Sequence, residues 1–112
     1  MDPLSAATTI KALDGLALRA TVAARNIANA QTPGYRAQGV SFEAALAAAA
    51  ARGPQAVDAV TPQVTTASGA VAGEVRLDQE LTTASATALR YAALIDVLGR
   101  RLQLHSLITG GR

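Results

Sequence analysis

Both ends of the chain carry apolar residues in a seven-residue pattern that a long helix satisfies. From Ile10 to Ile27 these residues are spaced alternately three and four positions apart, which places them on one side of an α-helix. The same alternation runs from Leu77 to His105. Strand side chains alternate with a period of two, so a strand does not fit this spacing. The pattern therefore predicts a long helix at each end, the two packing as a coiled coil.

The predicted seam is the set of apolar residues expected to face partner helices. The N-terminal helix is expected from about Pro3 to Ala30, with Asp2 as its cap. The seam of the two helices consists of Ile10, Leu13, Ala17, Ala20, Ala24, Ile27, Leu81, Ala84, Ala88, Tyr91, Ile95, Leu98 and Leu102. Half of the chain is apolar, but aromatic residues make up only 3%, so such a seam buries little area. We infer a subunit that completes its core by assembly. The alternative is a helical hairpin closed within one chain.

The middle of the chain lacks a long periodic pattern. A short helix is expected from Phe42 to Ala51, with Ser41 as its cap and Gly53-Pro54 ending it. Residues 55–73 are expected to form a flexible or irregular loop, with short strands as the alternative. Residues 74–78 alternate in a weakly strand-like way. The prediction is an all-α fold in three parts: an N-terminal axial helix with its turn (1–36), a short helix and loop (37–77) and a C-terminal axial helix (78–112).

Several chemistries are excluded by composition. The chain has no Cys and one His, so disulfides, thiolate nucleophiles and the usual zinc sites are ruled out. Asp78 and Glu80 lie two positions apart and do not face each other on a helix. The net charge of +2 is not a nucleic-acid footprint, and no apolar run approaches the ~20 residues of a membrane span. We therefore expect that the chain is not an enzyme and that it binds no cofactor, metal ion, small-molecule substrate or nucleic acid. We also expect that it does not insert into a membrane.

One segment after the first helix is distinctive. It contains Asn26, Ile27, Ala28 and Asn29, then two residues, then Thr32, Pro33, Gly34, Tyr35 and Arg36. Pro33-Gly34 fits the centre of a type II turn. The segment resembles the signature of the bacterial flagellar rod and hook axial proteins. Residues 40–46, 75–80 and 89–94 are similar to segments of the FlgB family of basal-body rod proteins within that group, from whose pattern Glu74 and Arg76 depart.

The resemblance implies a structural subunit of the proximal rod, the drive shaft needed for flagellar motility. It also implies type III export without a cleaved signal peptide, and a place in the rod of the basal body, in the periplasmic space. The implied partners are copies of the chain, FlgC and related axial proteins, the adaptor FliE and the flagellar export gate. The alternatives are another short rod subunit such as FlgC and a cytoplasmic helical adaptor or chaperone-like module.

Four side chains keep two interpretations each. Tyr35 is either a staple over the turn or an anchor between subunits. His105 lies on the heptad pattern and is interpreted as a packing residue, with pH sensing as the alternative. Arg100 and Arg101 are either helix-end charges or contacts to a neighbouring subunit.

Overall fold

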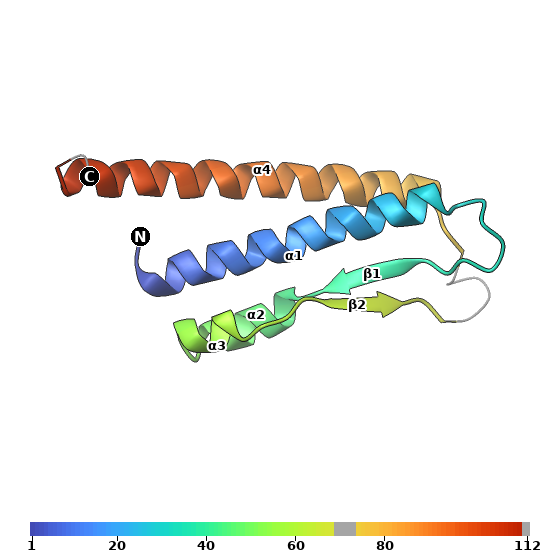
Figure 1. The fold of residues 1–112 in the computed structure, drawn as a ribbon, viewed down its shortest axis with the longest axis horizontal. Coiled ribbons are helices and arrows are strands. Elements are labelled where there is room, and N and C mark those ends of the chain that lie inside the picture. The colour runs from blue at the N-terminus through green and yellow to red at the C-terminus, as the bar shows by residue number, and fades with distance from the viewer. Residues whose placement is uncertain (69–73, 111–112) are drawn as a thin grey trace.

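The molecule is elongated and is built on two long helices. A computed structural model of the chain describes residues 1–68 and 74–110. Helices α1 (Pro3–Ala28) and α4 (Leu77–Ile108) lie antiparallel, side by side, along the longest dimension of a body measuring 58 × 26 × 15 Å (Figure 1). The middle of the chain packs along α1, largely on the side away from α4. The prediction of long helices at both ends is confirmed.

Local chemistry sets the start of α1 where the sequence placed it. Asp2 is the cap: its carboxylate accepts a 2.7 Å hydrogen bond from the Ser5 backbone N–H. This bond holds the pKa of Asp2 below its ordinary value. Pro3 occupies the first turn, where its missing N–H costs nothing. The helix ends at Ala28, with Asn29 as its C-terminal cap.

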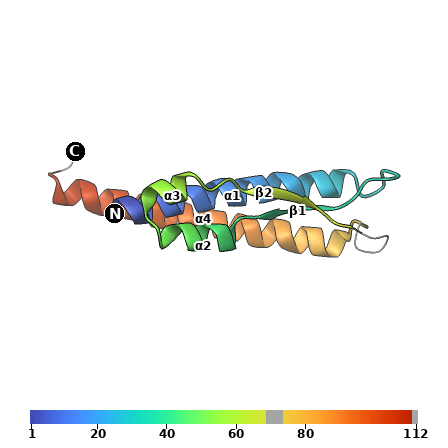
Figure 2. The same ribbon diagram turned by 90° about the horizontal axis from the view of Figure 1, so that it is seen from below.

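The middle of the chain corrects the all-α prediction. Strand β1 (Gln38–Ser41) pairs antiparallel with β2 (Gln63–Thr66), so that Gln38 lies opposite Thr66 and Ser41 lies opposite Gln63. Between them run two short helices, α2 (Glu43–Ala50) and α3 (Pro54–Asp58), which lie toward the N-terminal end of α1 (Figure 2). The strands form because α1 binds the backbone of β1, a contact between distant segments that local pattern does not encode.

Three local expectations are wrong for physical reasons. Ser41 pairs in β1 and does not cap α2, which follows Phe42 without a side-chain cap. Gly53 has a φ of +110° and Pro54 begins α3, so this dipeptide starts a second helix where a loop was expected. The strand-like residues 74–78 form no strand, since residues 74–76 are irregular and Leu77 and Asp78 are the first two residues of α4. Residues 69–73 of the expected loop and residues 111–112 lie outside the described part of the chain.

The core lies between α1 and the middle of the chain. Its cluster of buried apolar residues contains one residue from α1 and four from the segments that pack on it: Leu16, Phe42, Leu46, Ala49 and Val57. The Phe42 ring is the one aromatic side chain in this cluster, and it packs directly against α1 at Gly15. Burial of apolar area, at about 25 cal/mol per Å², therefore holds the middle of the chain on α1.

Candidate functional site

The signature segment folds around the side chain of Asn26. Asn26 is fully buried near the end of α1. Its Oδ1 accepts hydrogen bonds from the Tyr35 hydroxyl (2.7 Å) and from the Gln38 backbone N–H (3.0 Å), and its Nδ2 donates to the Gln38 carbonyl (2.8 Å). A buried amide with three partners is well satisfied. Asn26 thus joins the helix, the turn and the first residue of β1.

The second asparagine of the signature organises the turn itself. Nδ2 of Asn29 donates to the Arg25 carbonyl at 2.9 Å, and Oδ1 accepts from the Thr32 hydroxyl at 3.1 Å. The Tyr35 N–H donates to the Thr32 carbonyl at 3.2 Å, and Gly34 has a φ of +79°. Positive φ at the third residue is what a type II turn requires. The turn expected at Pro33-Gly34 is therefore present.

Most of the polar signature residues are thus used within the chain. Tyr35 is half-buried, and its hydroxyl is bound to Asn26, so its contact is the local staple over the turn. Ile27 is half-buried, whereas Ala28 and Pro33 are exposed. In the structure, this segment ends α1 and directs the chain back along that helix as β1.

An ion pair joins α1 to the start of α2. The Arg19 guanidinium donates to both Glu43 carboxylate oxygens, at 2.6 and 2.7 Å, and to the Val40 carbonyl at 2.8 Å. Its central carbon lies 4.9 Å from the centre of the Phe42 ring. The hydrogen bonds from Arg19 lower the pKa of Glu43 to about 2. Sequence reasoning missed this pair because 24 positions separate the two residues and no periodicity relates them.

The predicted seam divides between two environments. Leu13 is buried, and Ile27, Ala84 and Leu98 are half-buried. The rest of the seam is exposed in the single chain, namely Ile10, Ala17, Ala20, Ala24, Leu81, Ala88, Tyr91, Ile95 and Leu102. We call these nine residues the open face.

The reason for this division is that α1 has two apolar sides. Leu16, Val22 and Ala23 are buried on one side, and Leu16 belongs to the core cluster that the middle of the chain forms on α1. On α4, the most buried side chain is Thr87, which was not in the predicted seam. Heptad counting assigned one stripe to each helix. The contact between α1 and α4 is rotated from that stripe, and it leaves the open face uncovered.

The open face is hollowed where alanines gather. A cavity of about 400 Å³ lies between α1 and α4. Its lining is almost entirely apolar: Leu16, Ala17, Ala20, Thr87, Ala88, Tyr91 and Ala92. Small side chains at such a place let the backbone of another helix approach closely. The other open-face residues continue above and below the cavity at helical spacing.

The C-terminal end of α4 adds exposed apolar surface. In both views α4 extends past the start of α1 (Figures 1 and 2). Leu107 and Ile108 are 76% and 84% exposed. The ion pair on this part of the helix is local: Arg100 lies 3.0 Å from Asp96, one turn earlier, and both side chains are largely exposed.

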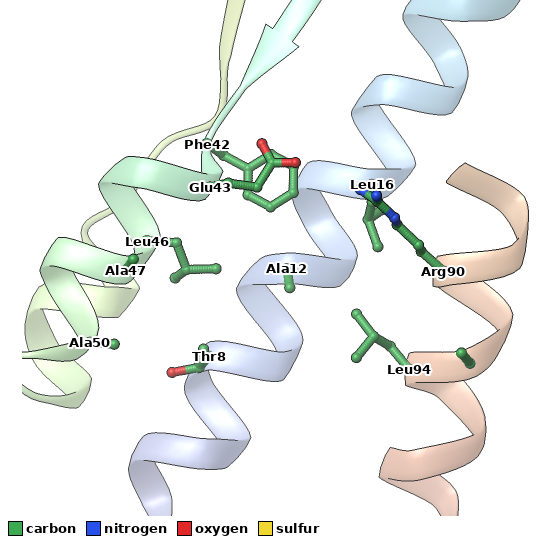
Figure 3. Close-up of a pocket in the computed structure, with 11 residues that line it drawn as sticks. Thr8, Ala12, Leu16, Phe42, Glu43, Leu46, Ala47, Ala50, Arg90 and Leu94 are labelled. Carbon is green, nitrogen blue, oxygen red and sulfur yellow. The ribbon is translucent and has the colours of Figure 1, made fainter. Parts of the chain in front are cut away.

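A second groove lies on another side of α1. It has a volume of about 520 Å³ and lies between residues of α1, α4 and α2 with the residue before it (Figure 3). Its lining residues are Thr8, Ala12, Leu16, Phe42, Glu43, Leu46, Ala47, Ala50, Arg90, Ala93 and Leu94. Apart from Thr8, Glu43 and Arg90 this lining is apolar. The Thr8 Oγ1 is buried without a hydrogen-bond partner among the described residues. The groove has the character of a binding surface.

Two further properties bear on the type of site. Within residues 1–68 and 74–110, no group of three or more His, Cys, Asp or Glu side chains is placed to hold a metal ion. Over the same residues, no helix combines the length and apolarity needed to cross a membrane.

Comparisons with known proteins add no relative. No model of a known protein family matches the chain, and no curated protein sequence matches it.

Proposed function

We propose that the chain is a structural subunit of the bacterial flagellar basal-body rod, of the FlgB type found at the proximal end. The observation that carries the proposal is the signature segment of residues 26–36, which resembles that of axial proteins and stands at the end of a long N-terminal helix. Its hydrogen bonds supply a physical reason for the residue types: Asn26, Asn29, Thr32 and Tyr35 bond to one another or to nearby backbone.

The open face supplies the assembly surface in this proposal. It runs along both long helices, is apolar, and lacks a covering element among the described residues. We propose that neighbouring subunits cover it by packing their own helices against it as a coiled coil, since alanine at the cavity permits close approach. The neighbours would be copies of this chain, FlgC and related axial proteins, the adaptor FliE and the export gate. The chain would reach the periplasmic rod by type III export, without a cleaved signal peptide.

Fractionation of basal bodies tests the proposal. Intact basal bodies purified from cells that make this chain are expected to contain it, and a strain lacking its gene is expected to grow normally without rods or swimming. Normal flagella in the deletion strain would contradict the proposal. A rod that retains its proximal part but lacks the next segment would assign the chain to a FlgC-type position instead.

A cytoplasmic helical adaptor is the second candidate, and the groove in Figure 3 is the observation that favours it. A groove of about 520 Å³ with Leu46, Ala47 and Leu94 along it could hold an apolar helix of a client protein. The same fractionation separates the two functions. An adaptor would remain in the cytosol and be absent from washed basal bodies, whereas a rod subunit would remain with them after washing.

A further inference from the structure

The two-stranded sheet has one closed edge and one open edge. In its antiparallel ladder the residues alternate between pairs that bond to each other and pairs whose backbone groups point outward. The Ala67 N–H donates to the Ala37 carbonyl at 3.0 Å, so residues 37 and 67 form a bonded pair. Counting along the register, Gln38 and Val40 of β1, and Val64 and Thr66 of β2, direct their backbone N–H and C=O groups away from the ladder.

Side chains of α1 close the β1 edge. Asn26 bonds to both the N–H and the carbonyl of Gln38, at 3.0 and 2.8 Å, and Arg19 donates to the Val40 carbonyl at 2.8 Å. Nothing comparable occurs on β2: among the described residues, no group outside β1 bonds to the outward backbone of Val64 or Thr66. β2 lies outermost in the molecule, beyond β1 as seen from α1 (Figure 1), and all four of its residues are exposed.

The β2 edge carries no charge that would discourage another strand from pairing with it. Native edge strands are protected by short length, proline, charged side chains, bulges or a covering element, and within the described part of the chain β2 has only the first two, being four residues long and following Pro62. No charged residue occurs from Ala59 to Gly73, and β2 reads Gln-Val-Thr-Thr, with Val64 44% exposed. β-Branched residues favour strand pairing. The edge is therefore suited to an uncharged strand of the same kind.

We infer that the open edge of β2 pairs with β2 of a second copy of the chain, antiparallel and centred on Thr65. In this register Val64 of one copy and Thr66 of the other exchange both backbone hydrogen bonds, and Thr65 faces Thr65 at the two-fold axis. Such an interface is self-complementary, and Thr–Thr and Val–Thr pairs across strands are favourable. Pro62 disfavours the register centred on Val64, because that register would set Thr66 against Pro62, which has no N–H to donate.

Two four-residue strands bury much less than the ~1,000 Å² of a stable interface, so the pair is transient in solution. The chain contains no Cys, and a single engineered Cys can therefore trap it. At the axis the facing residues form a non-bonded pair with Cα atoms about 4.5 Å apart, which is within the span of a disulfide. Gln63 of one copy would lie about four residues, or roughly 13 Å, along the strand from Gln63 of the other.

The experiment oxidises purified single-Cys variants of the full chain. Thr65→Cys is expected to give a disulfide-linked dimer, and Gln63→Cys, on the same exposed strand, is expected to stay monomeric. Adding Thr66→Pro to Thr65→Cys removes one outward N–H and leaves the ladder to β1 intact, so the dimer is expected to be lost while the circular dichroism spectrum stays unchanged. Equal cross-linking at positions 63 and 65, or a dimer that survives Thr66→Pro with the fold intact, overturns the inference. Because the purified chain is used, either result is independent of the rod proposal.

Discussion

Gly15 and Phe42 are in direct contact across the core: a Cβ atom added to Gly15 would lie 2.5 Å from the Phe42 ring. Glycine in the middle of a helix costs roughly 1 kcal/mol relative to alanine. Here it allows the only phenylalanine of the chain to pack closely against α1. Arg19, one turn further along the same helix, also lies over this ring, with its central carbon 4.9 Å from the ring centre.

Gly15→Ala is therefore expected to destabilise the chain, against the usual effect of this change in a helix. The gain in helix propensity is about 1 kcal/mol, whereas overpacking a core typically costs about 1–3 kcal/mol. Urea unfolding followed by circular dichroism measures the difference. Gly99→Ala is the matched control, because a Cβ at this other helical glycine meets nothing within 4 Å, and it is expected to stabilise the chain. A gain in stability for Gly15→Ala would contradict the packing described here.

The sequence predicts the helices much better than it predicts what packs on them. Caps and periodicity are local, so both ends of α1 and the start of α4 fall within two residues of expectation. The strands β1 and β2 depend on Asn26 and Arg19 reaching across from α1, and no window of local sequence contains both partners. The heptad pattern predicts one apolar stripe on each helix. The most buried side chain of α4, Thr87, lies outside that stripe, because the rotation of α4 against α1 depends on packing between distant segments.

Asn26 is expected to be the most sensitive residue of the signature. Asn26→Ala removes the partners of the Tyr35 hydroxyl and of both Gln38 backbone groups, at about 1–3 kcal/mol for each buried group left unsatisfied. Tyr35→Phe removes one of these bonds and should cost about 1 kcal/mol. Urea midpoints of the two variants test this order. If Tyr35→Phe were the more damaging change, the Asn26 hydrogen bonds would not be what fixes the turn.

The ion pair between Arg19 and Glu43 predicts an acid-sensitive part of the stability. The pKa of Glu43 is lowered from 4.5 to about 2 in the folded chain. A carboxylate whose pKa is lowered by folding stabilises the folded state at any pH above its ordinary pKa. This contribution is lost as the pH falls from about 4.5 toward 2. The Glu43 side chain is 54% exposed, so solvent screening keeps the effect small.

Glu43→Gln isolates this contribution, because the other carboxylates remain in both proteins. Near neutral pH the variant is expected to unfold at lower urea concentration than the original chain. The gap between the two midpoints should narrow as the pH falls through the window from about 4.5 to 2. A gap that stays constant over this range would mean that the titration of Glu43 does not contribute to folding.

Ile95 tests the open face without disturbing the fold. It is 46% exposed on α4, whereas Leu98, one turn later, is half-buried. Leu98→Asp would place a charge in partly buried surface and weaken the chain itself. Ile95→Asp leaves much of the new side chain in water in the single chain, so its urea midpoint should fall only slightly. In an assembled rod the same carboxylate would be buried against a neighbour without a partner, which costs several kcal/mol. The variant is therefore expected to be exported but missing from purified basal bodies, with motility lost.

Gln103→Asp, exposed and outside the open face, is the control and should be incorporated normally. Normal incorporation of Ile95→Asp would show that subunits do not meet through this face, even if the chain is found in the rod.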